Sequence, residues 1–405
     1  MPVAARGAGG PRVTSSGPLS GVKVVDMSVM ISGPLSAMML ADQGADVVKV
    51  ESPGIGDMMR FLGSSKGGMT GIFALNNRGK RSIGINLKSD RGGEILRALL
   101  SDADVLIQNF RPGALDKLGF GYESVRAMNP GIVYVSISGF GQDGPRSGQR
   151  VYDNIIQAAS GLASVQTDRA TSRPQIFRTL VCDKVTSYTV AQAVTAALFA
   201  RERGAGGQHV EVAMLDAAIS FMWPDTAMDV ALLDDDVTRT PTIGENYAAL
   251  ELRDGFVAVS AVSQPEFEGY MRALNGSHLL DDPRFADAGA RSVNVADLRT
   301  EVKKLTDAIT VEEFLANALV HDVPASSINT LVSAPDEPQV VHNASFFKRE
   351  HPVAGRIREA RHAPRFHGTP TGVASHAPMR GEHTDEILAG LGLDPAEIRA
   401  TDAVF

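Results

Sequence analysis

The sequence predicts an α/β fold, in which a Rossmann-like large domain with a mainly parallel sheet is joined to a smaller α+β domain. Three observations lead to this prediction. Strand-like, β-branched runs alternate with helix-length segments over residues 22–138, which is typical of βαβ units. The chain has 405 residues, which favours two hydrophobic cores over one. After the acidic stretch 234–236 the pattern changes to a hairpin followed by helices.

The first part of the chain supplies the elements of the parallel sheet. Short apolar runs predict strands over residues 22–27, 46–51, 81–87, 103–109 and 132–138. Amphipathic or helix-length segments between them predict helices over residues 33–45, 90–100 and 114–128. A stretch that we interpret as rich in helix follows over 153–232, with a long helix from about residue 186 to residue 203.

The later part of the chain predicts the smaller domain. Two strand-like runs, 247–252 and 256–262, are separated by the turn sequence RDG, which indicates a hairpin. Helices are expected over 264–275, 297–308, 311–321 and, near the end of the chain, 382–391. We therefore expect a flexible tail over 1–17, a large domain over 18–232 plus 336–405, and a small domain over 233–335.

Composition excludes several classes of function. The net charge of −8 and the pI near 5.6 argue against general binding to nucleic acid or to an anionic membrane. Cys182 is the one cysteine, so an internal disulfide is impossible and a reducing cytoplasm fits. No apolar run reaches the roughly 18 residues of a membrane span. The nine histidines lack metal-ligand spacing, so no metal site is expected.

The glycine pattern argues against conventional nucleotide motifs. The strand over 22–27 is followed by SVMISGPLS, which lacks the dinucleotide fingerprint, and no Walker A motif occurs. Gly33 and Pro34 nevertheless stand at a helix start, where free backbone N–H groups can face an anion. Basic side chains recur in the loops after strands, either as solvated surface charges or as ligands of a phosphate-rich molecule: Arg78, Lys80, Arg81, Lys88, Arg111, Lys117, Arg146 and Arg150.

Several blocks of this sequence, taken in order, resemble the class III CoA-transferase family, also called the CaiB/BaiF family. They begin with LSGVKVVDMSVMISGPLSAMMLADQGADVVKVESPGIGD and continue with NNRGKRSIGINLKSDRG, ADVLIQNFRPGALDKLGFGYE, NPGIVYVSISGFGQDGP and YDNIIQAASGL. A further block, VCDKVTSYTVAQAVTAALFARERGAGGQHVEVAMLD, surrounds the position of the family's catalytic carboxylate. The resemblance is strong over about residues 19–230. Formyl-CoA transferase, carnitine CoA-transferase and α-methylacyl-CoA racemase belong to this family.

The resemblance implies a set of site residues. The nucleophilic aspartate of the family falls on Asp183. Coenzyme A would contact Ile31, Ser32, Ile85, Asn86, Leu87, Lys88, Asn109, Phe110, Arg111, Lys117 and Arg150. The substrate side would hold Tyr152, Asp153 and Gln264.

The resemblance also implies a fold, partners and a reaction. Each chain of the family forms an open ring, and two rings interlock into a homodimer. The substrates would be an acyl-CoA and a carboxylic acid, with no tightly bound cofactor. CoA would move between carboxylic acids through an aspartyl anhydride and an aspartyl-CoA thioester. An aspartate of ordinary pKa is ionised at pH 7, as such a nucleophile requires.

Each of these residues also has a structural interpretation. On sequence alone Asp183 is a helix N-cap, Tyr152 a packed tyrosine, Asp153 a helix cap, and Cys182 a buried, inert thiol. Two other functions stay open, a racemase of the same family and a non-catalytic CoA-binding protein. The racemase branch carries a histidine and a glutamate where this chain has Tyr152 and Gln264, which favours the transferase. The short 238–248 segment has one glycine, against an oxalate-specific enzyme.

Overall fold

The computed structural model describes residues 16–168, 170–240, 242–372 and 374–405. The predicted tail over 1–17 therefore lies almost entirely outside the described residues. The chain divides into two compact units. We call the first the sheet unit (Met1–Leu233 with Phe346–Phe405) and the second the small unit (Asp234–Ser345).

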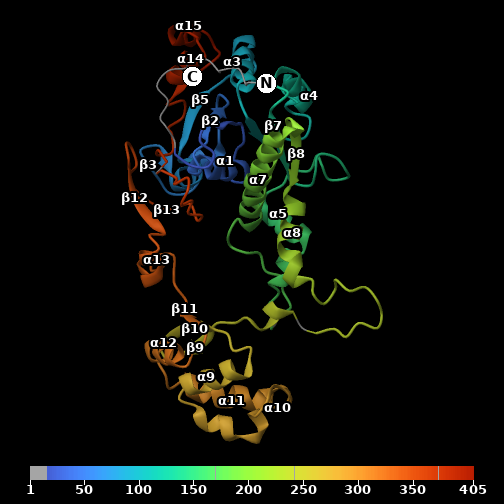
Figure 1. The fold of residues 1–405 in the computed structure, drawn as a ribbon, viewed down its shortest axis with the longest axis vertical. Helices are drawn as coiled ribbons and strands as arrows, with labels where there is room; N and C mark the ends of the chain where they lie inside the picture. Colours follow the sequence, from blue (N-terminus) through green and yellow to red (C-terminus); the bar gives the residue numbers. More distant parts are fainter. Residues whose placement is uncertain (1–15, 169, 241, 373) are drawn as a thin grey trace. The chain divides into compact units, whose positions relative to one another are not determined.

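The sheet unit is built on six parallel strands, as the alternating pattern predicted (Figure 1). Their spatial order is β5-β2-β1-β6-β7-β8. The strands are β1 (Lys23–Asp26), β2 (Asp46–Glu51), β5 (Lys80–Gly84), β6 (Val105–Gln108), β7 (Val133–Ser138) and β8 (Gln208–Ala213). A mainly parallel α/β fold is thereby confirmed.

The sixth strand corrects the sequence-based prediction. The stretch 153–232 was expected to be rich in helix, but β8 within it pairs with β7 along its whole length. The sequence QHVEVA carries only a weak strand pattern, because β8 is the edge strand and only its last two residues are fully buried. Edge strands bury fewer side chains, so their apolar signal is weaker.

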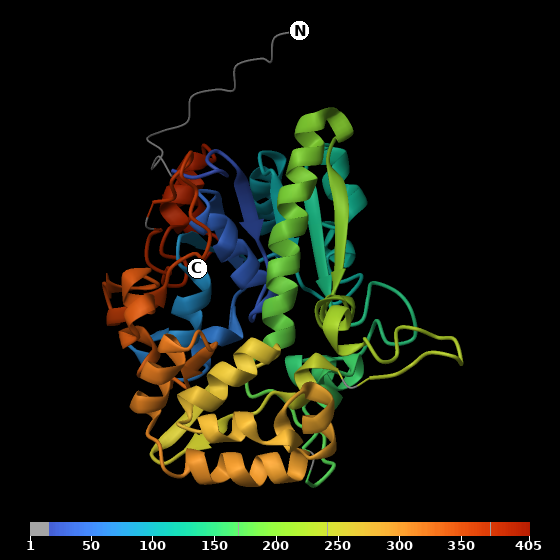
Figure 2. The same cartoon turned by 60° about the horizontal axis from the view of Figure 1, so that its bottom comes forward.

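Helices cover both faces of the sheet. One face packs against α1 (Ser32–Asp42), α5 (Asp153–Ser160), α6 (Leu162–Val165), α7 (Val181–Ala200) and α8 (Met214–Thr226). Figure 2 shows α7, the longest of these, lying along the strands. The opposite face packs against α3 (Asp90–Ser101), α4 (Tyr122–Met128), α14 (Thr384–Gly390) and α15 (Pro395–Arg399). A helix α2 (Gly71–Asn77) and the short strands β3 (Ser65–Lys66) and β4 (Met69–Thr70) follow β2.

The end of the chain belongs to the sheet unit. A hairpin of β12 (Phe346–His351) and β13 (Gly355–Ala360) precedes α14. Beyond α15 the chain reaches β5, where the Asn86 amide donates to the Ala403 carbonyl at 2.8 Å and Ile85 pairs with Val404. The last residues therefore flank the segment 85–88 that follows β5.

The small unit is α+β. Strands β9 (Leu250–Leu252) and β10 (Gly255–Val259) form the predicted antiparallel hairpin, and β11 (Ala325–Ser327) adds a third strand. Its helices are α9 (Gln264–Ala273), α10 (Ala288–Val293), α11 (Val295–Thr306), α12 (Val311–Val320) and α13 (Pro338–His342). A separate core around Met271, Phe285 and Phe314 holds the unit together.

Candidate active site

The carboxyl end of the sheet has a switch point between β1 and β6. From β1 the chain runs through β2 to β5 on one side, and then returns through β6 and β7 to β8 on the other. Ligands of open parallel sheets bind at such a point, because the loops after the two strands diverge there. Asn109, just after β6, joins the two loops through its side chain. It accepts from the Val29 amide at 2.9 Å and donates to the Val29 carbonyl at 2.7 Å.

The amino end of α1 lies at this switch point. The first amides of a helix have no partner within the helix, so they are available to an anion. Close packing restricts residue 33 to glycine, since a Cβ there would lie 2.2 Å from the Cβ and Oγ of Ser28. Gly33 therefore lets the loop after β1 fold tightly under the start of the helix.

Asp183 meets this helix end from α7. The backbone N–H of Ser32 lies close enough to the Asp183 carboxylate to lower its pKa. Asp183 is the third residue of α7, and the N-cap position belongs to Leu180, so the N-cap interpretation of Asp183 is wrong. Its own backbone N–H donates instead to Asp153 Oδ2 at 2.9 Å. Two carboxylates from different helices thus lie side by side at the switch point.

The environment of Asp183 makes its carboxyl group a weak acid. Burial, and then the neighbouring charge of Asp153, raise its pKa to about 7, while the hydrogen bond from Ser32 lowers it. The pKa of Asp183 is thus well above that of an ordinary aspartate, which is ionised at pH 7. With a pKa near 7, about half of the molecules carry the carboxylate at neutral pH. A desolvated carboxylate is also a stronger nucleophile than a hydrated one.

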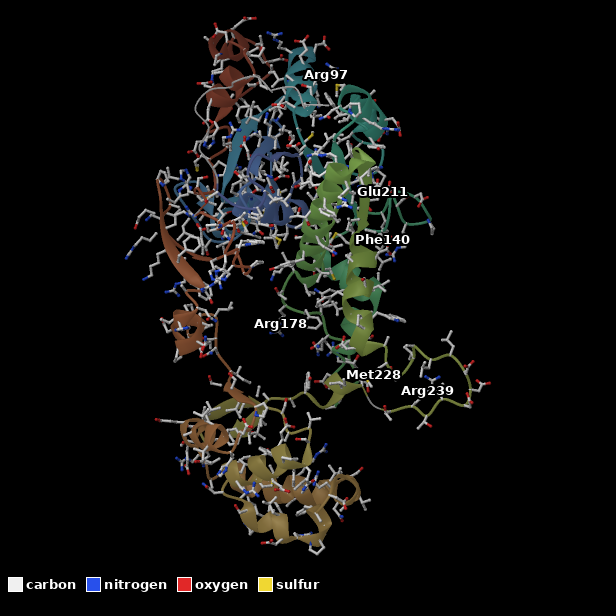
Figure 3. All side chains as sticks on the ribbon, viewed as in Figure 1. Arg97, Phe140, Arg178, Glu211, Met228 and Arg239 are labelled. Atoms are coloured by element: carbon white, nitrogen blue, oxygen red, sulfur yellow. The ribbon has the colours of Figure 1, made fainter. Side chains whose placement is uncertain are left out.

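Asp153 is held firmly in place. It is buried, and its Oδ1 accepts from Gln157 Nε2 at 2.5 Å. Gln157 in turn accepts from the Phe177 amide, which fixes the segment that leads into α7. Figure 3 labels Arg178 on this segment. Asp153 is the first residue of α5 and Tyr152 holds the N-cap position, so the cap interpretation of Asp153 is wrong.

The structure places the predicted CoA positions in the loops after the strands of the sheet unit. Ile31, Ser32 and Ile85 are buried, whereas Lys88, Arg111, Lys117 and Arg150 are exposed. The segment 85–88 follows β5, and 109–111 follows β6, where Phe110 donates its amide to Gln108. In the loop after β7, the Arg146 guanidinium lies 3.8 Å from the ring centre of Phe140, which is labelled in Figure 3. The strand order thus brings 31–32 and 109–111 together at the switch point.

Two of the basic residues singled out in the sequence are neither surface charges nor free phosphate ligands. Lys80 is completely buried and donates to Asp26, Asn77 and the Pro34 carbonyl, each at 2.8 Å. Arg78 is 5% exposed and makes a bidentate pair with Asp42. The sequence suggested either solvated surface charges or ligands of a phosphate-rich molecule, and both interpretations are wrong for these two residues. Their burial depends on contacts that only the folded structure reveals.

Three further expectations can be compared with the structure. Tyr152 is 68% exposed, so the interpretation as a packed tyrosine is wrong. Cys182 is buried as predicted, and burial raises the pKa of its thiol to about 12, which disfavours the thiolate. Gln264 lies in the small unit, where it accepts from Arg291 at 2.8 Å and donates to the Ala286 carbonyl.

Comparison with known proteins decides the family. The model of CoA-transferase family III matches residues 19–384. The chain belongs to CoA-transferase family III. It is a CoA-transferase enzyme, and its sheet unit carries the class III fold.

Relatives of this class III enzyme cover nearly its whole length. Succinyl-CoA:glutarate CoA-transferase of Mus musculus is 32% identical, over 92% of this chain and 86% of its own. Succinyl-CoA:mesaconate CoA-transferase of Haloarcula marismortui is 32% identical, over 93% and 97%. The crystal structure of a CAIB/BAIF family protein from Brucella suis superimposes with a TM-score of 0.82 at 32% identity, covering 93% of this chain and all of that one.

Two features are absent from the part of the chain that the structure describes. No group of three or more His, Cys, Asp or Glu side chains could hold a metal ion within residues 16–168, 170–240, 242–372 and 374–405. Among the helices of the same ranges, none combines the length and apolarity needed to cross a membrane.

Proposed function

We propose that this class III enzyme moves CoA from an acyl-CoA to a free carboxylic acid, with Asp183 as the covalent nucleophile. The observation that carries the proposal is the position of the Asp183 carboxylate, half-buried at the switch point and close to the first amide of α1. The predicted CoA positions 31–32 and 109–111 lie in the two loops that meet there. A reactive carboxylate at the bound thioester is what CoA exchange requires.

The reaction follows from the chemistry of a carboxylate. A carboxylate oxygen of Asp183 attacks the thioester carbonyl and expels CoA thiolate, which leaves a mixed anhydride. The thiolate then attacks the Asp183 carbonyl carbon and releases the donor acid, so that an aspartyl-CoA thioester remains. The acceptor carboxylate attacks that carbonyl and expels the thiolate again, and the thiolate finally attacks the acyl carbonyl of the new anhydride. Acyl-CoA of the acceptor leaves, and Asp183 returns as a free carboxylate.

The amino end of α1 suits the charge that develops in these steps. Each attack creates an oxyanion on a tetrahedral carbon, and one backbone donor contributes about 3 kcal/mol to its stabilisation in measured cases. The Ser32 amide is close enough to the Asp183 carboxylate to lower its pKa, and this proximity favours its stabilising an oxyanion at the Asp183 carbonyl. The Asp183 amide is occupied by Asp153 and does not serve this role.

We further propose a short dicarboxylic acid as a substrate. The relatives from Mus musculus and Haloarcula marismortui are named for exchange between succinyl-CoA and glutarate or mesaconate. A second carboxylate needs a cation, and the exposed Lys184 directly follows Asp183. The Lys184 ammonium donates to the hydroxyl of Thr179, so it is oriented toward the segment that leads into α7.

Covalent trapping tests the mechanism. The protein is incubated with succinyl-CoA, reduced with borohydride or treated with hydroxylamine, and digested for mass spectrometry. We expect the modification on the peptide that contains Asp183, because the aspartyl-CoA thioester and the anhydride both react with these reagents. A panel of other acyl-CoAs then identifies the donor. Modification of another residue, with Asp183 untouched, would contradict the proposed nucleophile.

We also propose that the enzyme is a homodimer, in keeping with the interlocked rings of its family. Large apolar side chains remain exposed along α7 and α8, including Tyr188 (63%), Phe199 (66%) and Phe221 (56%). A hollow of about 490 Å³ beside them is lined by Ile219, Trp223 and Pro224 together with Asp216 and Ser220. Exposed apolar patches of this kind are typical of subunit interfaces.

Sedimentation at nanomolar concentration checks the dimer. Interlocked chains cannot separate without unfolding, so we expect a dimer at every dilution. A folded monomer at nanomolar concentration would contradict the interlocked arrangement.

A further inference from the structure

A group of fully buried charges lies beneath the loop that joins β1 to α1. We call it the buried charge cluster: Asp26, Lys49, Asp57 and Lys80, each with no exposed surface. Lys49 Nζ lies 3.0 Å from Asp57 and 3.8 Å from Asp26, while Lys80 Nζ lies 2.8 Å from Asp26. Buried ion pairs are weak sources of stability, because desolvation offsets their attraction. Their presence here therefore calls for another reason.

The cluster binds the backbone of the loop at several points. Asp26 accepts from the Ser28 amide at 2.9 Å, and Lys49 donates to the Ser28 carbonyl at 2.8 Å. In the middle of the loop, Asp57 Oδ1 accepts from the Met30 amide at 3.1 Å. Beyond the loop, in the first turn of α1, Lys80 donates to the Pro34 carbonyl. Buried backbone groups need such partners, and here charged side chains supply them on both sides of Ser32.

Met30 shows that the loop conformation is imposed. Its φ angle of +65° lies in the left-handed region, which residues other than glycine rarely adopt. Such a conformation persists only when the surroundings fix it. Asp57 holds the Met30 amide, and Asn109 holds both backbone groups of Val29 beside it. This turn directs the chain so that Ser32 begins α1 against Asp183.

We propose that the buried charge cluster, through Asp57 above all, is a positioning device that holds the Met30 turn so that the Ser32 amide reaches the Asp183 carboxylate. This arrangement matters for catalysis only if Asp183 is the nucleophile, so the inference rests on the proposed function. Asp57 would act through the loop and would not touch the substrate. The charged and polar groups that face Asp183 are Asp153 from α5 and the Ser32 amide from α1, with Cys182 beside it on α7.

Two substitutions of Asp57 distinguish the effect of its hydrogen bond to the Met30 amide from the effect of its negative charge. Asp57→Ala removes the oxygen that accepts from the Met30 and Met59 amides, and it also removes the partner of Lys49. Asp57→Asn removes the charge and keeps an acceptor oxygen. The pKa of Asp183 is read in the free full-length enzyme by NMR of ¹³C-labelled aspartate side chains, with the signal assigned by its loss in Asp183→Asn. We expect Asp57→Ala to raise the pKa of Asp183 by about half a unit or more, because the Ser32 hydrogen bond lowers it. In the transfer assay kcat should fall at least tenfold, with KM for acyl-CoA within threefold.

Three further variants serve as controls for Asp57→Ala. Asp57→Asn should stay within threefold of wild type in kcat and should leave the pKa of Asp183 nearly unchanged. Asp42→Ala breaks the buried pair with Arg78 at the other end of α1, so it should change stability but neither the pKa of Asp183 nor kcat. If Asp57→Ala does not fold, Asp57→Ala combined with Lys49→Met removes both charges of the pair and should give the same two effects.

The outcomes separate this inference from the proposed mechanism. An unchanged pKa of Asp183 and an unchanged kcat in both Asp57→Ala and the double variant would overturn it, and so would an Asp57→Asn variant as defective as Asp57→Ala. The pKa readout needs no turnover. A shifted pKa in an enzyme that forms no adduct at Asp183 would support the positioning role while removing the proposed nucleophile.

Discussion

Asp183→Asn should abolish CoA transfer and at the same time make the protein more stable. An amide cannot attack a thioester, so we expect kcat to fall by about 10³-fold or more, which corresponds to about 4 kcal/mol of barrier. Activity is measured as CoA transfer from succinyl-CoA to a dicarboxylic acid. Activity within about tenfold of wild type would contradict the proposed mechanism.

The gain in stability follows from the raised pKa of Asp183. The folded protein holds this group at a pKa of about 7, against 3.8 for an ordinary aspartate, so folding disfavours its ionisation. The penalty is absent below pH 4, grows between pH 4 and pH 7, and is complete above pH 7. One pKa unit corresponds to 1.36 kcal/mol, which puts the upper limit of the gain in Asp183→Asn at about 4 kcal/mol. Urea unfolding of both proteins at pH 4 and pH 8 should therefore agree at the lower pH and diverge at the higher.

A matched control comes from another helix. Asp90 is exposed in the first turn of α3, where a negative charge is favourable. Asp90→Asn should leave transfer unchanged and lower stability by about 0.3–1 kcal/mol. If Asp183→Asn raises the stability and Asp90→Asn lowers it, the gain at Asp183 is due to the burial of its carboxyl group. A loss of stability in Asp183→Asn at pH 8 would contradict the raised pKa.

Incubation with a chiral 2-methylacyl-CoA in deuterated water should give no deuterium at the α-carbon above the uncatalysed background. All bond changes of a transferase occur at carbonyl carbons, whereas a racemase must remove and return the α-hydrogen. A relay of that kind needs an acid and a base on opposite faces. In this chain the corresponding positions hold Tyr152 and Gln264, and the amide of Gln264 is neutral at every pH. Mass spectrometry and chiral analysis of the recovered thioester provide the measurement.

The same reaction mixture contains its own positive control. A second carboxylic acid, present from the start, should acquire CoA as the donor acid is released. Rapid deuteration with loss of chirality would identify the enzyme as a racemase. The pair of carboxyl groups Asp153 and Asp183 would then be the first candidates for the proton transfer.

The sequence was sufficient to predict the parallel sheet but not all of its strands. Five strands lie in apolar runs between helices, and these runs carry a strong periodic signal. The sixth, β8, was missed because its first residues are only partly buried. The small-unit hairpin was found through its turn sequence, RDG. The extent of the two domains and the roles of the site residues stay predictions.

The site itself was less accessible to sequence reasoning than the fold. The resemblance pointed to Asp183, yet its raised pKa depends on burial and on Asp153, which lies 30 residues earlier in the chain. The buried charge cluster was missed altogether. A signal did exist, since Lys49 stands inside the apolar run DVVKVE and Asp26 ends VKVVD. A charge within a buried strand demands a buried partner, but the sequence does not say which one.

The contact between the segment after β5 and the last residues of the chain has a consequence for how the protein is synthesised. The Asn86 side chain donates to the Asp402 carbonyl, 316 residues later in the chain. At about 5–20 residues per second, a ribosome needs about 15–60 s to synthesise that interval. During this time Ile85, just beyond the edge strand β5, lacks Val404, with which it forms an isolated β-bridge in the finished protein. Unpaired backbone groups at a sheet edge can pair with other strands, so this end of the sheet is open to mispairing until the last residues are made.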